Sequence, residues 1–363
     1  MAGRGGKLSR GDTRRPHGAG LVLLGLSVGV WAGCSAGAGG ALAQPADTTV
    51  EAFYAGRTLD LVVGFPPGGS NDVYARHVAH HLSKHVPGTP RIISRNMPGA
   101  GGLAAANWLY NQAPKDGTVI GLAAPALPLD EKLGTPNIRF ETAKFQWIGR
   151  VSTSVNQLFV WQTSKAMSVR DAYEREITLG ATGAGSTVSV YPNVLNKLLG
   201  TRFKIIMGYK SSTEAMLALE RGETEGHSTS WEALKSLHAD WIREGKVRIL
   251  LQFAAKRHAE MPDVPTAFEL AKSDEQRAIL KAVLNAVEIG KSFKLPPEVP
   301  AARVNALRRA FDATMKDPEF LAEFKPMGLP VEPMTGEDLQ ALVADVAAIP
   351  PELAAKVKAV YGD

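Results

Sequence analysis

Two glycine-rich turns, far apart in the chain, are the segments best suited to bind a small anion. One runs from Phe65 to Asp72 and the other from Thr182 to Thr187, and each follows a run typical of a buried strand. Such a turn leaves backbone N–H groups unpaired at a helix start, where the helix dipole favours negative charge. One turn in each half predicts two facing walls with a ligand between them. The alternative is two ordinary tight turns with helix caps.

Two other motifs suggest rival chemistry. Histidines at 77, 81 and 85 recur every four residues, a spacing that can present imidazoles to a metal ion. Because no acid or cysteine lies between them, we interpret them as a solvated helix face and expect no metal and no cofactor.

The segment 226–230 resembles a nucleophile elbow but lacks its final glycine. A secreted serine hydrolase using Ser228 is therefore the less favoured alternative to a protein that is not an enzyme.

The first 43 residues have the pattern of a secretory signal peptide. Basic residues are followed by an apolar run from Leu21 to Trp31 and by Ala41-Leu42-Ala43. The pattern predicts cleavage after Ala43 and export to the periplasm. The apolar run is well short of the roughly 20 residues needed to span a bilayer. Cys34 leaves lipid attachment as a less favoured alternative.

Removal of this leader changes the electrostatic interpretation. It holds five basic residues and one acid, so its loss lowers the formal net charge from +5 to +1. The remainder has no strongly basic surface to attract nucleic acid, and it contains no cysteine for disulfides, metal binding or nucleophilic catalysis. The part after the leader has about 320 residues, enough for two domains.

Strand and helix signals alternate along this part and predict an α/β protein with parallel sheets. The expected strands lie at 59–65, 91–94, 118–123, 178–181, 203–207 and 247–253. The expected helices run over 70–85, from about 103 to 113, after Thr187, and from Ser211, which forms a capping box with Glu214. A helix after Pro300 carries the apolar stripe Val304, Leu307, Phe311 and Met315.

Several motifs in order resemble those of tripartite tricarboxylate transporter receptors, the Bug-type periplasmic solute-binding proteins. They are 66–72 with Ala75-Arg76, the N-x-P-G-A-G-G turn at 96–102, the D-G-T strand entry at 116–118, the segment 256–269, and the C-terminal segments 297–303 and 317–319. The chain departs from the family at Val190-Tyr191, at Tyr209-Lys210-Ser211 and at 222–226. It therefore resembles a divergent branch of the family.

The resemblance implies a type II periplasmic-binding-protein fold, with two α/β lobes, a two-strand hinge and a ligand cleft between them. Lobe 1 would comprise 44–158 and 255–363, and lobe 2 would comprise 159–254. The protein would be a monomeric receptor that passes a small carboxylate to the membrane permease subunits of a tripartite tricarboxylate-type transporter, or else a ligand-sensing partner of a sensor kinase. Its ligand contacts would come from Phe65, Pro67, Gly68, Gly69, Ser70, Asp72, Ala124, Pro125, Gly185, Ser186, Thr187 and Ser228.

Overall fold

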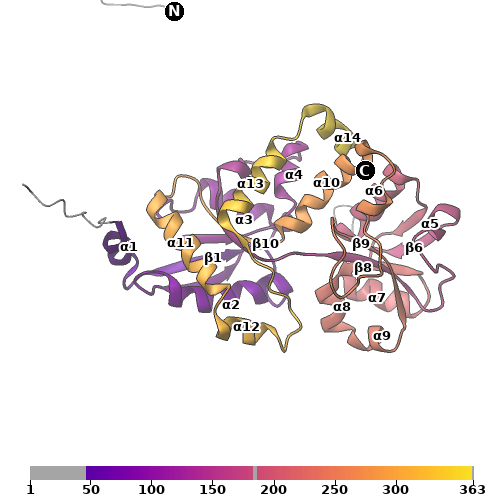
Figure 1. The fold of residues 1–363 in the computed structure, drawn as a ribbon, viewed down its shortest axis with the longest axis horizontal. Helices are drawn as coiled ribbons and strands as arrows, with labels where there is room; N and C mark the ends of the chain where they lie inside the picture. The colour runs from indigo at the N-terminus through magenta and orange to yellow at the C-terminus, as the bar shows by residue number, and fades with distance from the viewer. Residues whose placement is uncertain (1–45, 183–185, 362–363) are drawn as a thin grey trace, which may run out of the picture. The chain divides into compact units, whose positions relative to one another are not determined.

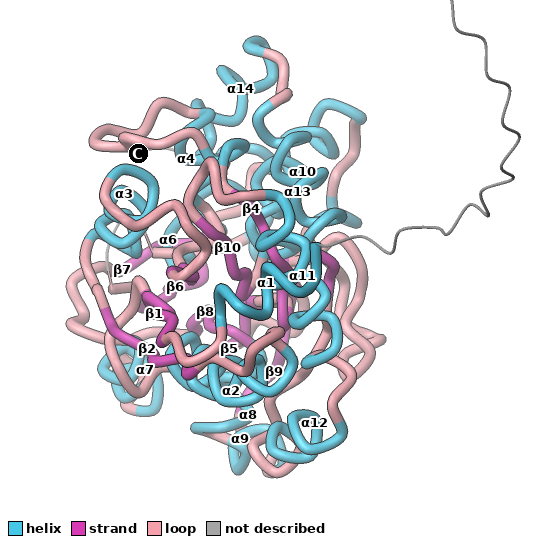
Figure 2. The backbone as a smooth tube through the Cα atoms, turned by 90° about the vertical axis from the view of Figure 1, so that its left-hand side faces the viewer, coloured by secondary structure: helices cyan, strands magenta, loops and turns pink. Residues whose placement is uncertain are grey.

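The computed structural model describes residues 46–182 and 186–361, which form two β-sheets flanked by helices (Figure 1). In Figure 2 the strands run through the middle of the molecule and the helices lie around them. Each sheet is buried on both faces by its own helices, as expected for sheets that contain parallel strands. We call the first sheet with the helices on its faces lobe 1, and the second sheet with its helices lobe 2.

The first sheet has six strands in the order β11-β4-β10-β3-β1-β2. Their bounds are β1 Thr58–Val63, β2 Arg91–Asn96, β3 Val119–Leu122, β4 Gln146–Ser152, β10 Lys291–Leu295 and β11 Met334–Thr335. Its helices are α1 Ala46–Tyr54, α2 Ser70–His85, α3 Leu103–Asn111, α4 Leu127–Lys132, α11 Ala301–Thr314, α12 Pro318–Phe324 and α13 Gly336–Ala347, with short 3-10 helices at Ala100–Gly102 and Thr142–Lys144. One core cluster joins α2, α11 and α12 to one face of the sheet, and another joins α3 and α13 to the opposite face.

The second sheet has five strands in the order β7-β6-β8-β5-β9. They are β5 Asn156–Trp161, β6 Ile177–Gly180, β7 Phe203–Ile206, β8 Gly226–Ser230 and β9 Val247–Phe253. Helices α5 Asp171–Glu174, α6 Thr187–Leu199, α7 Ser212–Glu220, α8 Trp231–Leu237 and α9 Ala239–Arg243 belong to this part of the chain. A 3-10 helix at Phe268–Leu270, α10 Asp274–Ile289 and the C-terminal α14 Pro351–Tyr361 pack with α6 in one core cluster.

The two sheets repeat one topology. In the first, β1 pairs in parallel with β2 and β3, and the antiparallel strand β10 lies between β3 and β4. In the second, β6 pairs in parallel with β7 and β8, and the antiparallel strand β5 lies between β8 and β9. Along the chain, each inserted strand comes after a strand of the other sheet: β5 follows β4, joined to it by 153–155, and β10 follows β9 after α10. The two lobes are therefore linked by exchanged strands. The lobe boundaries given above stay a prediction.

The first glycine-rich turn leads into α2 as the sequence predicts. The helix begins at Ser70, after Gly69 in extended conformation, and ends at His85. Its buried face carries Tyr74, Val78 and Leu82, which pack against the first sheet with the stripe on α11. All four residues of that predicted stripe are buried.

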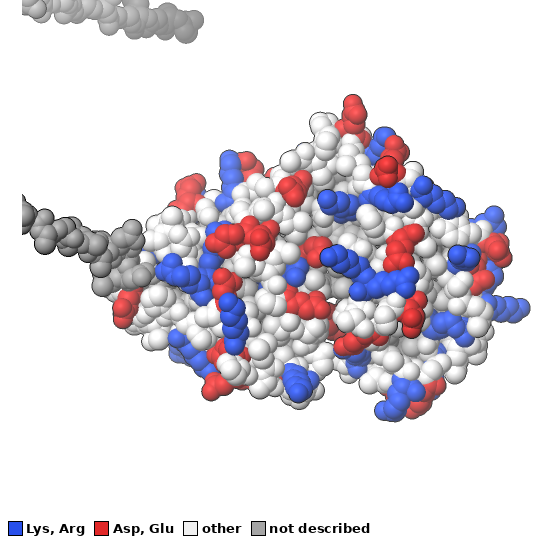
Figure 3. Space-filling view, in the orientation of Figure 1, with Lys and Arg blue, Asp and Glu red and all other residues white. Residues whose placement is uncertain are grey.

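Charges of both signs are interspersed on the face shown in Figure 3, where lysines and arginines lie beside aspartates and glutamates. Among the helices of the described residues, none is both long and apolar enough to cross a membrane.

Candidate ligand-binding cleft

A cleft of about 880 Å³ is lined by residues from both lobes. Lobe 1 contributes Phe65, Ser70 and the loop after β3, and lobe 2 contributes Thr187 and the end of β8. This size suits a small organic ligand. A smaller cavity of about 490 Å³ lies between α4 and α14, and no residue predicted to bind ligand lines it.

Four helices begin at this cleft. Ser70 is the first residue of α2, Thr187 of α6 and Ser212 of α7, and Ser230 is the N-cap of α8; all four line the cleft. The first N–H groups of a helix have no partner within it, and the dipole makes that end positive. The cleft thus combines helix N-termini and hydroxyl groups from both lobes, an arrangement that favours an anionic ligand.

Lys291 of β10 also lines the cleft, although only 3% of it is exposed. Its Nζ donates to the carbonyl oxygen of Thr153 at 3.2 Å and to Ser154 Oγ at 3.1 Å, and it lies 3.8 Å from Glu232 Oε1. Burial lowers the pKa of Lys291, an effect that Glu232 and Glu332 oppose. Since β10 belongs to lobe 1 and Glu232 lies in the first turn of α8 in lobe 2, this ion pair joins the lobes.

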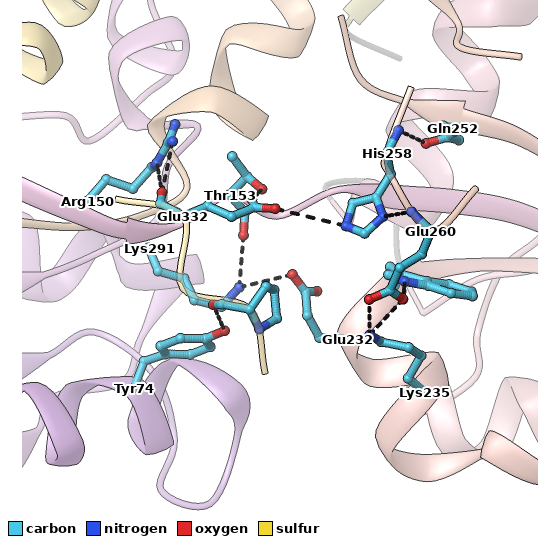
Figure 4. A network of polar contacts seen from close by, with 12 residues as sticks. Tyr74, Arg150, Thr153, Glu232, Lys235, Gln252, His258, Glu260, Lys291 and Glu332 are labelled. Atoms are coloured by element: carbon cyan, nitrogen blue, oxygen red, sulfur yellow. Dashed lines mark hydrogen bonds and ion pairs between the residues drawn. The ribbon is translucent and has the colours of Figure 1, made fainter. Parts of the chain in front are cut away.

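The Lys291 pair is part of a larger polar network between the lobes (Figure 4). The backbone carbonyl of Glu332 accepts hydrogen bonds from Arg150 at 3.0 and 3.2 Å. Its carboxylate accepts one from Thr153 and lies 4.0 Å from His258 Nε2. His258 in turn accepts from the N–H of Glu260 at 3.1 Å. The connection from β4 to β5 is thereby tied to the segment that follows β9.

A carboxylate lies at another part of the cleft wall. Asp130 of α4 lines the cleft with Tyr191 and Tyr361. Its side chain has no hydrogen bond or ion pair to another described residue, and burial raises its pKa to about 6. Burial also raises the pKa of Tyr361, and Asp130 adds to that effect. The cleft therefore contains both a cation and an ionisable acid.

The structure brings together part of the predicted ligand set. Phe65, Ser70, Ala124, Pro125 and Thr187 line the cleft. Pro67, Gly68, Gly69, Ser186 and Ser228 are in or near the same segments but not in its lining, and Gly185 lies outside the described residues. The ligand-binding role of all these residues stays a prediction.

Asp72, predicted as a possible ligand contact, holds the first turn in place. Its Oδ2 accepts hydrogen bonds from the N–H of Gly68 and from Arg76, both at 2.9 Å, and its Oδ1 accepts from Asn96 at 2.7 Å. Burial alone would raise the pKa of Asp72, but the hydrogen bonds from Arg76, Gly68 and Asn96 lower it below its ordinary value. With both oxygens engaged, Asp72 positions the turn.

Ser228 is placed poorly for a nucleophile. It lies inside β8, is 1% exposed, and its Oγ has no hydrogen-bond partner among the described residues. The neighbouring His227 points its Nδ1 to the carbonyl oxygen of Gly180 at 2.7 Å, and burial lowers the pKa of His227 to about 4. An elbow requires its serine at an exposed strand-to-helix turn, whereas α8 begins only at Trp231.

The interpretation of the α2 histidines as a solvated face is wrong. Helix α12 covers them, and His81 is only 1% exposed. His77 Nδ1 lies 2.7 Å from Glu323 Oε2, and His85 Nε2 lies 3.0 Å from Asp317 Oδ2. No acid lies between the histidines in the sequence, and the acids that face them belong to the segment of α12, more than 200 residues away.

Sequence reasoning also missed Lys291, Asn156, Asp130 and Tyr361 in the cleft lining. Lys291 stands in the segment K-S-F-K-L, which has no apolar run to mark a strand. Asn156 follows the link between the lobes, and Tyr361 reaches the cleft only because α14 packs on α6 and α10. The charged side chains of Asp130 and Lys291 are the only sign in the sequence that these residues belong to a binding site.

This architecture defines a class of protein: two α/β lobes, linked by exchanged strands, that hold a small solute in the cleft between them. Residues 74–355 match the family model described as tripartite tricarboxylate transporter family receptor, TctC, and the chain belongs to that family. A UPF0065 protein of Cupriavidus necator is 31% identical over 240 residues, which cover 64% of this chain and 69% of that protein. BugT of Bordetella pertussis is 27% identical over 60% of this chain and 67% of BugT.

Solved structures show the same fold. The periplasmic binding protein BugD is similar with a TM-score of 0.61 at 22% identity, over 85% of this chain and 100% of BugD. MatC from Rhodopseudomonas palustris, solved with bound malate, has a TM-score of 0.59 at 20% identity over 82% of this chain and 99% of MatC. An R. palustris protein solved with adipate has a TM-score of 0.61 at 22% identity over 85% of this chain and 99% of its own. The predicted type II periplasmic-binding-protein fold is confirmed.

Proposed function

We propose that this chain is an extracytoplasmic receptor that captures a small carboxylate between its lobes and delivers it to the membrane subunits of a tripartite tricarboxylate-type transporter. The observation that carries the proposal is the cleft, which is lined by the first residues of α2 in lobe 1 and of α6 and α7 in lobe 2, and by the N-cap residue of α8. Hydrogen bonds from backbone N–H groups to a carboxylate are charge-assisted and strong.

The comparisons support the ligand class. Two proteins of the same fold were solved with malate and with adipate, both small dicarboxylates. The cleft of this chain adds the cation of Lys291 to the helix N-termini. Capture would bring the lobes together about the exchanged strands, and the closed form would be the one that the membrane subunits recognise.

The same proposal includes export and the absence of catalysis. The leader pattern supports cleavage after Ala43 and a periplasmic location, as for BugD. The burial of Ser228 inside β8 argues against a hydrolase that would use it. We propose that the exported receptor acts as a monomer.

Thermal unfolding of the exported, purified protein tests the ligand class. Malate, adipate and other small mono- and dicarboxylates are compared with glucose and choline. At least one carboxylate should raise the melting temperature, since a ligand at 100 times its Kd adds about 2.7 kcal/mol of stability. A shift with glucose or choline and none with any carboxylate would overturn the proposal.

The helix start of α6 is then tested with the best carboxylate of that series. Thr187→Val removes a hydroxyl that lines the cleft and should weaken binding about tenfold, the loss expected for one hydrogen bond to a charged group. Thr163→Val is the matched control, because Thr163 is also exposed but does not line the cleft. If the two variants bind the carboxylate with equal affinity, the N-terminus of α6 is not part of the binding site.

A further inference from the structure

Away from the cleft, α2 and α12 bring histidines and carboxylates together. The two helices lie side by side in Figures 1 and 2. Glu323 Oε2 lies 2.7 Å from His77 Nδ1 and 3.1 Å from His81 Nε2. Asp317 Oδ2 lies 3.6 Å from His81 Nδ1 and 3.0 Å from His85 Nε2. Each carboxylate therefore stands between two imidazoles.

The charge of this interface is not balanced when the histidines are neutral. Three carboxylates, those of Asp317, Glu319 and Glu323, face one lysine, Lys84, whose Nζ lies 2.6 Å from Glu319 Oε2. Two net negative charges then remain beside imidazole nitrogens, which are good ligands for metal ions when neutral. A bound divalent cation would neutralise them.

His81 supplies an independent observation. The residue is 1% exposed, and its Nε2 has no hydrogen-bond partner among the described residues although Glu323 Oε2 lies 3.1 Å away. Buried polar nitrogens are nearly always satisfied. A buried nitrogen that faces a carboxylate at 3.1 Å without a well-formed hydrogen bond to it is placed as a metal ligand would be.

The geometry permits a third ligand. One ligand atom from each of His80, His81 and Glu323 lies within 4.8 Å of the other two. Metal–ligand distances of roughly 2.0–2.2 Å separate neighbouring ligand atoms by about 3 to 3.5 Å. The His81–Glu323 separation already meets this value, and the exposed side chain of His80, within 4.8 Å of both atoms, would rotate to complete the group.

We propose that α2 and α12 bind a divalent transition-metal ion of the Zn²⁺ class through His80, His81 Nε2 and Glu323. Imidazole with a single carboxylate selects such an ion over Mg²⁺ or Ca²⁺, which prefer oxygen ligands. Lys84 Nζ lies 3.4 Å from the opposite ring nitrogen of His81 and Asp317 Oδ2 lies 3.6 Å from it, so on metal binding Asp317 would replace Lys84 as the partner of this nitrogen, where metal-bound histidines commonly have a carboxylate. The ion would fasten α12 to lobe 1 independently of any ligand in the cleft.

Calorimetric titration of the exported protein with ZnCl₂ tests the site, after chelator treatment and with a purification tag that holds no histidine. We expect one Zn²⁺ per chain at pH 7.5 and a higher melting temperature with Zn²⁺. His80→Gln and Glu323→Gln should each weaken binding at least tenfold.

His85→Gln is the matched control. His85 lies on the same helix and contacts Asp317, but it is outside the group formed by His80, His81 and Glu323. Its variant should keep the wild-type affinity within about threefold, and circular dichroism without metal should show that all three variants are folded. The absence of Zn²⁺ binding to the wild type, or binding that His80→Gln and Glu323→Gln leave unchanged, would overturn the proposal.

Discussion

At the scale of single residues, Asp130 shows why the cleft could be anticipated only in part. The glycine-rich turns predict helix starts near Ser70 and Thr187, and both residues line the cleft. Nothing in the neighbourhood of Asp130 or Lys291 in the sequence indicates that they face the same space, because α4 and β10 reach the cleft through long-range packing. Binding sites made of backbone groups can be predicted from glycine-rich turns in the sequence. The charged side chains that complete such sites cannot, because their positions depend on the tertiary fold.

Replacing Asp130 with asparagine should stabilise the protein at high pH. Burial raises the pKa of Asp130 to about 6, above its ordinary value of 3.8. The folded state therefore holds this proton more tightly than the unfolded state, and wild-type stability falls as the pH rises from about 4 to 6. Above pH 6 we expect Asp130→Asn to be more stable than wild type by about 1–3 kcal/mol. Urea denaturation at pH 4 and pH 8 measures the difference.

Asp345→Asn is the control for this substitution, because Asp345 is exposed on α13. It should leave stability unchanged at both pH values. If the cleft binds a carboxylate, the affinity of the wild type should also fall as Asp130 ionises, and that of Asp130→Asn should not. A wild type and an Asp130→Asn variant with parallel pH profiles would show that Asp130 is well solvated.

At the scale of elements, agreement with the sequence follows the strength of the local signal. Helix α2 has the predicted bounds, and Ser211 caps α7 by accepting from the N–H of Glu214, as the capping box predicts. The inserted strands β5 and β10 were not predicted. β10 has two lysines in five residues, and both are buried, Lys291 beside Glu232 and Lys294 over the ring of Trp147 at 4.4 Å. Only the tertiary fold makes such a segment a core strand.

The junction between α10 and β10 depends on Gly290. Its φ is +51°, and an added Cβ would lie 2.3 Å from the carbonyl oxygen of Ser152 and 3.0 Å from Thr153 Cα. These atoms belong to the end of β4 and to the link between the lobes, so the backbone itself would have to move. Gly290→Ala should cost at least about 3 kcal/mol of unfolding free energy, more than the roughly 1–2 kcal/mol of a positive φ alone.

Gly222→Ala separates the two effects. Gly222 has a φ of +76° with nothing within 4 Å of an added Cβ, so only backbone strain applies. Chemical denaturation of both variants gives the comparison. Equal losses of stability would mean that the link between the lobes adapts to the larger residue without cost.

At the scale of the whole molecule, the pattern of paired α/β halves predicted two lobes, and the fold confirms them. The repeated strand order of the two sheets could not be inferred, since the sequence shows no internal repeat. The exchange of β5 and β10 explains why the lobes share polar contacts beside the cleft. Any motion that opens the cleft must strain or break some of them.

Among the contacts between the lobes, loss of the Lys291–Glu232 ion pair should lower the free energy of unfolding most. Both residues are nearly fully buried, and Glu232 Oε2 has no hydrogen-bond partner among the described residues. Lys291→Met would leave the Glu232 carboxylate buried without its cation, which typically costs about 3–5 kcal/mol. Glu232→Gln should cost less, because Lys291 keeps its hydrogen bonds to Thr153 and Ser154. Lys291→Met combined with Glu232→Gln should recover most of the loss.

Lys235→Met provides the comparison on the same helix. Lys235 pairs with Glu260 at 2.8 Å, and both side chains are partly exposed, so its loss should cost no more than about 1 kcal/mol. Urea denaturation of the four variants measures all these differences. A Lys291→Met variant as stable as Lys235→Met would mean that water reaches Glu232, and the lobes would then separate at this point without an electrostatic cost. A large loss of stability that the double variant recovers would instead show that separating Lys291 from Glu232 is costly. Opening of the cleft would then be unfavourable unless a carboxylate ligand replaced Glu232 beside Lys291.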